Sequence, residues 1–428
     1  MSGVLNRRQL IQTTAVGAAA IGLRNTPLIA NDSPAGVVRV ALMGAGSRGG
    51  DLAKAFSGQA GIELRYVCDP DTKRAETLAK SLGDTGGKDL QAVTDFRRAL
   101  DDKSIDVLVV AAPNHWHAPA TILACDAGKH VYVEKPCSHN PREGELMIAA
   151  ARRNNRCVQV GMQRRSSEGL AEAIQKLHEG AIGRVYLART YYSNVRGSIG
   201  HSQPSTPPEG LDFELWQGPA ARKPFQENLL HYNWHWFWDY GNGEAGNNGV
   251  HFIDVARWGM GVGNPVRVSS TGGRYHFDDD QQTPDTNVVT LEYDGERMIH
   301  WECSSCVKYE TDDVVFHGTE GTLAVRGSEY KITDRNGKPL SEGGKVSAPT
   351  EQHVANFLEA VRGDSHKSLA AEVEDANRST LATELANISY RVGRTLECDP
   401  ATGRIRNDDA AMQLWGREYA AGWEPRAS

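Results

Sequence analysis

The 428-residue sequence lacks several features that define whole classes of protein. It has no excess of positive charge, because 47 Lys and Arg residues face 54 Asp and Glu residues, and a net charge of −7 argues against a nucleic-acid-binding protein. Its seven cysteines are odd in number and scattered, which predicts no disulfide framework. Cys303 and Cys306 form the only close pair, and without a second pair at zinc-site spacing we expect packing residues and no metal site.

Long apolar runs are also absent, and the most informative short run lies near the N-terminus. Residues 13–23 are mostly apolar but too few to span a bilayer, so we expect no membrane span. Arg7 and Arg8 stand ahead of this run, an arrangement that resembles a twin-arginine export signal. We therefore expect residues 1–33 to be a signal and linker, cleaved near Ala30, and the mature protein to be periplasmic or otherwise exported. A basic tail or a mitochondrial-type presequence is the alternative.

The composition that is present, with 39% hydrophobic and 24% charged residues, is that of a soluble globular protein of about two domains.

In the first domain, an apolar strand over residues 37–43 is followed by a glycine-rich turn and then by a helical pattern. The turn consists of Gly44, Ala45, Gly46, Ser47, Arg48 and Gly49. Its glycines permit a tight turn, close approach of backbone N–H groups to a pyrophosphate, and close packing of helix on strand. The pattern predicts a dinucleotide-binding site.

A second predicted strand, residues 62–68, ends at Asp69, twenty residues after the last glycine of the turn. A carboxylate at this position accepts hydrogen bonds from both hydroxyls of an adenosine ribose and repels a 2′-phosphate, so NAD is the favoured cofactor. Lys73 and Arg74 lie close enough to keep NADP as the alternative. Strands and helices continue to alternate, which predicts a doubly wound parallel sheet, and we assign residues 36–161 to an NAD(P)-binding Rossmann domain.

Polar residues follow two further predicted strands of this sheet. The strand at 106–112 is followed by Pro113, Asn114 and His117, and the strand at 130–133 by Glu134, Lys135 and Pro136. Open α/β sheets bind their ligands at the carboxyl ends of the strands, so we expect these residues at the same edge as the glycine turn. A solvated lysine at a strand end is the alternative for Lys135 taken alone.

The pattern changes after the Rossmann domain, and we assign residues 162–396 to a second, substrate-binding and oligomerisation domain of α/β type. Alternating strands with glycine turns from 265 to 333 predict a large open, mainly antiparallel sheet. One face of such a sheet must be covered by helices or by another subunit. Helices are expected at 351–362 and 371–394, and residues 397–428 form a C-terminal tail.

Residues 194–248 show no clear periodicity, and loops of this length in compact domains are usually functional. They contain an aromatic cluster, Trp234, His235, Trp236, Phe237 and Trp238. Aromatic faces suit the C–H faces of a sugar ring, and a satellite hydrophobic core is the alternative.

A helix is predicted after this region, with Asn247 or Asn248 as its N-cap. His251 and Asp254 lie within one turn of each other on one face of the helix. A histidine near a helix start suits general-base catalysis if it faces the nucleotide, because its ordinary pKa is near neutrality. A structural His–Asp pair is the alternative.

In this order, the motifs resemble those of the glucose–fructose oxidoreductase / inositol dehydrogenase / rhizopine-catabolism (Gfo/Idh/MocA) family. The likeness runs from about residue 37 to 396 and rests on GAGSRG at 44–49, Asp69, PNHWH at 113–117, EKP at 134–136 and GVHFID at 249–254. It implies a Rossmann domain joined to an α/β domain whose open sheet packs against other subunits of a homo-oligomer. It also implies that Lys135 and His251 flank the nicotinamide and a sugar or polyol substrate. Asn114 and His117 would lie near the nicotinamide ribose, and Arg164 near the substrate.

Asn247 departs from the family pattern, in which many dehydrogenases carry an aspartate four residues before the histidine. An amide orients an imidazole but does not stabilise imidazolium by charge, which leaves Asp254 or another carboxylate to compensate, or a different reaction. We take Arg164, Asn247 and Asp254 as candidate substrate-binding residues.

Three hypotheses follow for the function. The first is an exported NAD(P)-dependent oxidoreductase that acts on a sugar, glycoside or cyclic polyol, with Lys135 and His251 as catalytic residues and a tightly bound, recycled cofactor. The second is a redox-assisted NAD-dependent glycosidase of the same fold. The third is a non-catalytic sugar or nucleotide sensor.

Overall fold

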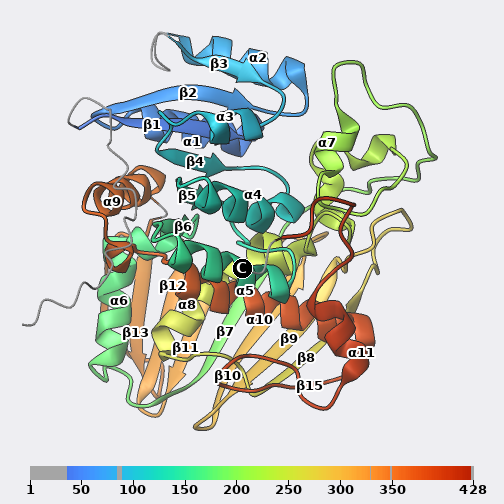
Figure 1. Ribbon diagram of the computed structural model, residues 1–428. Helices are drawn as coiled ribbons and strands as arrows, with labels where there is room; N and C mark the ends of the chain where they lie inside the picture. Colours follow the sequence, from blue (N-terminus) through green and yellow to red (C-terminus); the bar gives the residue numbers. More distant parts are fainter. Residues whose placement is uncertain (1–35, 84–88, 328, 348, 426–428) are drawn as a thin grey trace, which may run out of the picture.

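The computed structural model describes residues 36–83, 89–327, 329–347 and 349–425. Their strands form two sheets with helices packed around and between them (Figure 1). One sheet has six strands and the other has nine. The predicted fold class, a Rossmann sheet joined to an α/β domain with a large open sheet, is confirmed. The predicted twin-arginine segment lies outside the described residues.

The six-stranded sheet is parallel throughout, in the order β3-β2-β1-β4-β5-β6. Its strands are β1 (Val38–Met43), β2 (Ile62–Cys68), β3 (Gln91–Val93), β4 (Val107–Val110), β5 (His130–Val133) and β6 (Val158–Val160). Alternating with them are helices α1 (Ser47–Ser57), α2 (Thr72–Leu82), α3 (Arg97–Asp101), α4 (Asn114–Asp126) and α5 (Pro141–Arg153). β4 and β5 are buried along their whole length, because both faces of the sheet are covered. The strand order reverses between β1 and β4, where sheets of this kind bind ligands.

The nine-stranded sheet has the order β14-β13-β12-β11-β7-β10-β9-β8-β15, and only β7 and β10 pair in parallel. Its strands are β7 (Val185–Ser193), β8 (Arg267–Gly273), β9 (Thr286–Tyr293), β10 (Arg297–Ser304), β11 (Val314–Gly318), β12 (Gly321–Arg326), β13 (Glu329–Asp334), β14 (Pro339–Gly343) and β15 (Leu396–Glu397). Buried and more exposed residues alternate along β10 and β12, so one face packs on a core. Helices cover that face: α6 (Glu168–His178), α8 (Val250–Met260) and α10 (Val373–Val392).

Helix α9 (Thr350–Arg362) follows the nine-stranded sheet in sequence but packs on the Rossmann domain (Figure 1). The ring of Phe357 meets that of Tyr132 on β5 edge-on, with 5.9 Å between centroids. The C-terminal tail also returns to the first domain, where Trp423 meets Trp116 of α4 at 5.0 Å. Packing therefore crosses the domain boundaries expected from the sequence, which remain predictions.

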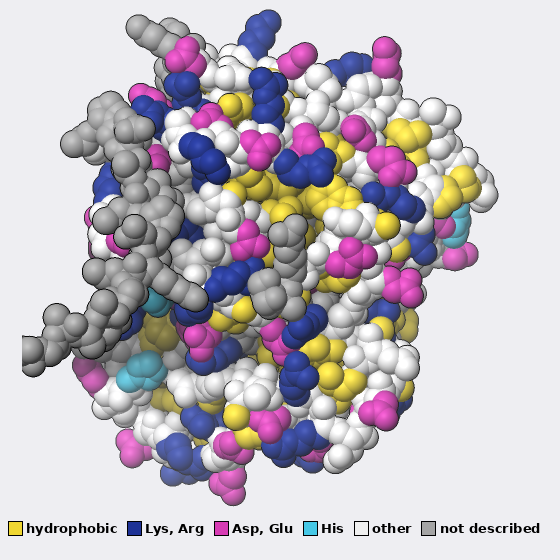
Figure 2. All heavy atoms as spheres, viewed as in Figure 1, with side chains coloured by type: hydrophobic (Ala, Val, Ile, Leu, Met, Phe, Trp, Pro, Cys, Tyr) yellow, Lys and Arg dark blue, Asp and Glu magenta, His cyan; other side chains and the backbone are white. Residues whose placement is uncertain are grey.

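One face of the molecule shows mixed charge, and the cysteines form no disulfide among the described residues. On the face shown in Figure 2, basic and acidic side chains are interspersed. All seven cysteines are free and buried, which agrees with a packing role for Cys303 and Cys306. Within the described residues, no helix is long and apolar enough to cross a membrane.

Candidate active site

A cavity of about 440 Å³ lies where the carboxyl ends of β1, β2, β4 and β5 meet residues of the second domain. Most residues proposed from the sequence line it: Gly44, Gly46, Ser47, Arg48, Asp69, Pro113, Asn114, His117, Glu134, Lys135, Asn247 and His251. Gly49, Arg164 and Asp254 are not part of this lining. The fold thus gathers chemically active groups from both domains around one space.

The glycine turn between β1 and α1 is tight for steric reasons. Gly44 has a φ of 102°, and a Cβ placed there would lie 2.4 Å from the carbonyl oxygen of Ala111. A Cβ on Gly49 would lie 1.9 Å from the carbonyl oxygen of Gly44, so Gly49 serves the packing of α1 on β1. Gly46 is the N-cap of α1, and the free N–H groups in the first turn of this helix make an anion-binding site.

Asp69, at the end of β2, is held by two backbone groups. One carboxylate oxygen accepts the Ala45 N–H at 2.7 Å, and the other accepts the Asp71 N–H at 2.9 Å. These bonds fix the carboxylate at the cavity wall, and each oxygen keeps a lone pair for a further donor such as a ribose hydroxyl. Burial raises the pKa of Asp69, an effect that the two backbone bonds and the positive charge of Arg74 oppose.

Asn114 opens α4 at the same edge of the sheet. Its side-chain oxygen is buried and has no hydrogen-bond partner among the described residues. A buried polar atom in this state is costly unless a ligand or water satisfies it. With the glycine turn for a pyrophosphate and Asp69 for a ribose, Asn114 completes a row of groups that fits a nicotinamide dinucleotide.

Lys135 connects the two domains through Asn247. Its ammonium donates to the backbone carbonyl of Asn247 at 2.7 Å and to the side-chain oxygen of the same residue at 3.2 Å. Burial lowers the pKa of Lys135, and the negative charges of Glu134 and Glu244 oppose that shift. Asn247 therefore orients Lys135, whereas the sequence pattern predicts that it orients the imidazole of His251.

The entrance to α8 differs from the expected capped helix. A π-helical turn, Ala245–Gly249, runs directly into α8, and no side chain caps the helix. The prediction of an N-cap at Asn247 or Asn248 is therefore wrong. Because the chain is already helical at these positions, the side chain of Asn247 is free to turn toward Lys135 and that of Asn248 toward Glu244.

His251 lies in the first turn of α8 and lines the cavity. Its imidazole makes no hydrogen bond to any other residue that the structure describes. Burial, followed by the positive charges of Lys135, Arg164 and Arg48, lowers the pKa of His251 well below its ordinary value. The lowered pKa favours the neutral form of the His251 imidazole.

Three other predicted residues brace the turn after β5. The ring nitrogens of His117 lie 2.6 Å from the carbonyl oxygen of Pro136 and 2.7 Å from that of Ala112. Arg48 donates from Nε to the carboxylate of Glu134 at 2.7 Å. His117 and the Arg48–Glu134 pair therefore hold the end of the strand in place.

Arg164 and Asp254 have partners outside the cavity. Arg164 donates to Asp313 at 3.0 Å, and its guanidinium lies 4.8 Å from the ring centroid of Phe252. Asp254 accepts two hydrogen bonds from Arg165, at 2.7 and 2.8 Å. The structure therefore places Asp254 in an ion pair and not beside the imidazole of His251, so it does not replace the missing aspartate.

The aromatic cluster at 234–238 is divided between the cavity and a satellite core, and its contact with a sugar stays a prediction. Trp234 and His235 line the cavity, with stacked rings 3.6 Å apart. Phe237 instead belongs to a satellite core. Sequence reasoning missed further lining residues of the irregular region, because no local pattern marks them: Leu211, Trp216, His231 and Tyr232.

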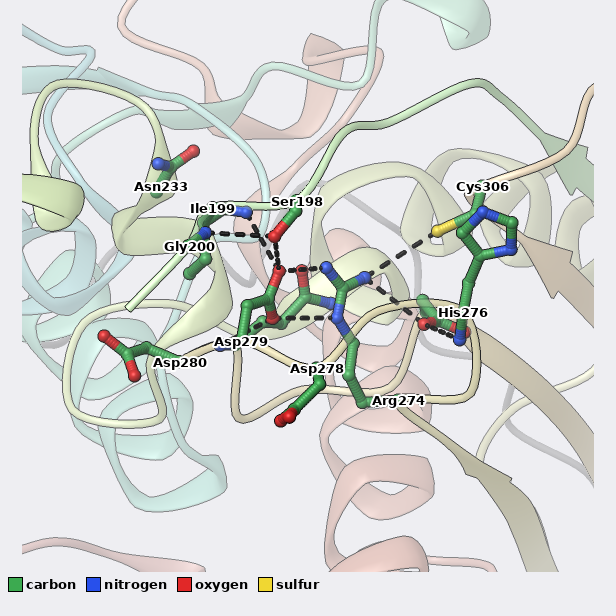
Figure 3. A network of polar contacts seen from close by, with 12 residues as sticks. Ser198, Ile199, Gly200, Asn233, Arg274, His276, Asp278, Asp279, Asp280 and Cys306 are labelled. Carbon is green, nitrogen blue, oxygen red and sulfur yellow. Dashed lines mark hydrogen bonds and ion pairs between the residues drawn. The ribbon is translucent and has the colours of Figure 1, made fainter. Parts of the chain in front are cut away.

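A polar network fixes the loop of residues 274–285, which contacts the aromatic cluster (Figure 3). Arg274 donates to Asp279 at 2.5 and 3.0 Å and to Asp285 at 3.2 Å. Asp279 also accepts from the Ser198 hydroxyl at 2.8 Å. Further along the same loop, the N–H groups of residues 282 and 283 donate to the carbonyl of Trp236 at 3.0 and 3.3 Å. The buried charges thus hold a loop whose backbone N–H groups contact the aromatic cluster.

Comparison with known proteins places these features in a family. Residues 38–162 match the oxidoreductase family model of the NAD-binding Rossmann fold, and residues 193–425 match that of the C-terminal α/β domain. Inositol 2-dehydrogenase 4 of Saccharopolyspora erythraea is 34% identical over 168 residues, 38% of this chain and 47% of that protein. A glycosyl hydrolase family 109 protein of the same organism is 27% identical over 218 residues, 46% of this chain and 47% of that protein. Each alignment covers about half the length of the relative.

Among solved structures, levoglucosan dehydrogenase in complex with NADH and levoglucosan shares the fold, with a TM-score of 0.66. The match covers 84% of this chain and 99% of that one at 20% identity, which shows a common architecture and leaves the substrate open. The C-terminal family model alone covers more than half of the 428 residues. The chain therefore belongs to the Gfo/Idh/MocA oxidoreductase family, in which an NAD-binding Rossmann domain is joined to a C-terminal α/β domain.

Proposed function

We propose that the protein oxidises a hydroxyl group of a sugar, glycoside or cyclic polyol and uses NAD as the hydride acceptor. The observation that carries this proposal is the meeting of Lys135 and His251, from different domains, on one cavity with Asp69 and Asn114. When bound, NAD supplies the acceptor for the hydride that leaves the substrate carbon. The protein must take up the hydroxyl proton, and two basic side chains with lowered pKa values are present for that purpose.

His251 is the proposed base. Its imidazole is neutral and has no hydrogen-bond partner within the described part of the chain, so a ring nitrogen can accept the hydroxyl proton. Lys135, held by Asn247, donates a hydrogen bond to the same oxygen or exchanges the proton with it. An oriented ammonium also stabilises the negative charge that develops on that oxygen.

The cofactor is NAD in this proposal, because Asp69 disfavours a 2′-phosphate; Arg74 lines the cavity and keeps NADP as the alternative. The residues ahead of position 36 carry the twin-arginine pattern, and we propose export by that route to the periplasm. Free nicotinamide nucleotide is not expected outside the cytoplasm. A tightly bound cofactor, recycled by oxidation of one substrate and reduction of another, meets this condition.

The stacked rings of Trp234 and His235 offer a flat apolar surface at the cavity, which suits the C–H face of a sugar ring. Assembly is proposed through the outer face of the nine-stranded sheet. Tyr186 on β7 and Val288 on β9 are 41% and 39% exposed, although both are large apolar residues. A homo-oligomer formed through this sheet would cover them.

Redox-assisted glycoside cleavage is the second candidate, and the contact of Asn247 with Lys135 favours it. No carboxylate in the described part of the chain pairs with His251, and a partner of that kind would support net dehydrogenation. In a redox-assisted glycosidase, transient oxidation acidifies a neighbouring C–H bond and permits elimination of the aglycone. The similarity to a glycosyl hydrolase family 109 protein points in the same direction.

Absorbance of the nicotinamide separates these functions. The purified protein is examined for bound nucleotide, and reduction of that nucleotide is followed against a panel of sugars, polyols and glycosides. Accumulated reduction with sugars or polyols supports the oxidoreductase, and aglycone release without net reduction supports the glycosidase. A protein that binds no nucleotide and acts on no member of the panel refutes both.

A further inference from the structure

Residues 203–231, here called the α7 lobe, form a small unit inserted between β7 and α8 (Figure 1). The lobe is closed at its base, where the N–H of Ser205 donates to the carbonyl of Phe225 at 2.9 Å. Inside it, α7 (Phe213–Gln217) is capped by Asp212, whose side chain accepts the Leu215 N–H at 2.9 Å. The lobe contributes to a satellite core that includes Trp216, Ala220, Leu229, Phe237 and Tyr240. It therefore has the packing of a defined structural unit.

The α7 lobe docks on the turn between β2 and α2 through its main chain. The N–H of Thr72 donates to the carbonyl of Gly210 at 3.0 Å, and the N–H of Asp212 donates to the carbonyl of Pro70 at 2.9 Å. Between these two bonds, Leu211 pairs with Asp71 in an antiparallel bridge. The lobe thus pairs a short extended segment with the turn that begins at Asp69, the residue expected to bind a ribose.

The same docking places the lobe in the cavity wall. Leu211, Trp216 and His231 line the cavity together with Asp69 and Arg74. The imidazole of His231 also lies 3.5 Å from the carboxylate of the neighbouring Asp71. The end of the cavity where Asp69 would hold a ribose is therefore lined by residues that belong to the second domain.

We infer that the α7 lobe is part of the nucleotide site and retains the dinucleotide, whose adenosine end leaves only when the lobe separates from the β2–α2 turn. The inference rests on the proposed function, because it takes the dinucleotide as the ligand of this cavity. This contact consists of the two backbone hydrogen bonds of one bridge, and so small a contact opens locally without unfolding of either domain. Release then depends on that opening, and the cofactor stays bound from one turnover to the next.

Thr72→Pro tests this contact with little disturbance elsewhere. Thr72 is the first residue of α2, a position where proline is tolerated, and its exposed side chain has no part in the cavity. Asp71 before it is extended, with φ −90° and ψ 103°, as a residue that precedes proline prefers. The substitution removes the N–H that donates to Gly210 and leaves the cavity-lining residues unchanged.

Glu168→Pro is the matched control. Glu168 is the exposed first residue of α6, and Ser167 before it is extended with φ −81° and ψ 117°. Its N–H donates to no group in the described ranges. Both variants place a proline at the exposed first residue of a helix, and only Thr72→Pro loses a hydrogen bond to the lobe. Leu211→Ala is a further variant, which keeps the backbone bonds and shortens one wall residue.

Each protein is loaded with NADH and mixed with excess NAD, and the decay of nicotinamide fluorescence gives the release rate. Thr72→Pro is expected to release NADH about two- to tenfold faster than wild type, the effect of one lost hydrogen bond, while Glu168→Pro matches wild type. Leu211→Ala is also expected to release NADH faster than wild type. If Thr72→Pro does not fold, the release rate of Leu211→Ala tests the role of the lobe. Wild-type release rates in Thr72→Pro and Leu211→Ala, or equal acceleration by both prolines, overturn the role of the lobe alone. A wild-type protein that binds no NADH overturns the proposed function as well.

Discussion

Replacement of Asn247 by aspartate tests the arrangement of Lys135 and His251 directly. The side-chain oxygen of Asn247 lies 3.2 Å from the Lys135 ammonium. Asn247→Asp therefore places a negative charge at hydrogen-bond distance from a buried cation, with almost no change in side-chain volume. The new charge favours the protonated form of both Lys135 and His251, so both pKa values rise.

The distance sets the size of the effect. Two unit charges 3.2 Å apart interact by about 5 kcal/mol at an effective dielectric constant of about 20. Burial of the new carboxylate and loss of the existing amide contact offset part of this energy. A rise of about 1–3 units in the pKa of Lys135, the range usual for an opposite charge at this distance, is expected.

The assay is the pH dependence of kcat/KM. Because the proposed reaction needs an unprotonated base, the acid limb of the profile moves to higher pH by about one to three units in Asn247→Asp. Asn336→Asp adds the same charge at an exposed turn after β13 and is expected to leave the limb in place. A limb that stays in place, or moves to lower pH, in Asn247→Asp refutes the assignment of the proton-handling role to this pair.

Three further predictions concern Lys135, the glycine turn and a buried acid. Lys135→Met is expected to reduce turnover at least about 100-fold while NADH fluorescence shows retained cofactor binding, and unchanged turnover would remove Lys135 from the site. Gly49→Ala places a Cβ 1.9 Å from the Gly44 carbonyl oxygen, so a lower melting temperature and weaker NADH binding are expected, whereas Gly50→Ala, with only Leu78 nearby at 3.7 Å, is expected to keep both. Burial raises the pKa of Glu384 from 4.5 to about 8. The unfolded chain releases this proton first, so folding stability falls as pH rises from about 4.5 to about 8. Calorimetry of Glu384→Gln should show a flatter pH dependence in that window, and identical slopes in variant and wild type would contradict the assignment.

The Rossmann half was open to prediction because its signals are local. A tight turn between an apolar strand and a helix requires glycine where the backbone segments touch. Gly44 and Gly49 stand at such positions, because neither has room for a Cβ. The carboxyl ends of parallel strands share one sheet edge, so Asp69, Asn114 and Lys135 could be assigned to one site before any tertiary contact was known.

The contacts of the proposed catalytic residues were harder to predict, because their hydrogen-bond partners come from distant segments of the sequence. The amide of Asn247 and the ammonium of Lys135 are 112 residues apart in sequence, and no short-range pattern sets their contact. The spacing on α8 places Asp254 one turn from His251. In the structure, however, the carboxylate of Asp254 accepts hydrogen bonds from Arg165, which lies outside α8. The π-helical turn before α8 likewise replaced the expected cap, because the backbone there is already helical.

The sequence by itself determined the fold class, the position of the nucleotide-binding edge and the two basic residues at the candidate site. It could do so because strand, turn and helix patterns depend on a few neighbouring residues. Only the tertiary structure decided that Asn247 pairs with Lys135, that α9 packs on the Rossmann sheet, and that the α7 lobe docks on the β2–α2 turn. These contacts bury surfaces that meet only after the chain has folded. The partner of each buried charged group is likewise set by which distant segments lie close together in the folded state.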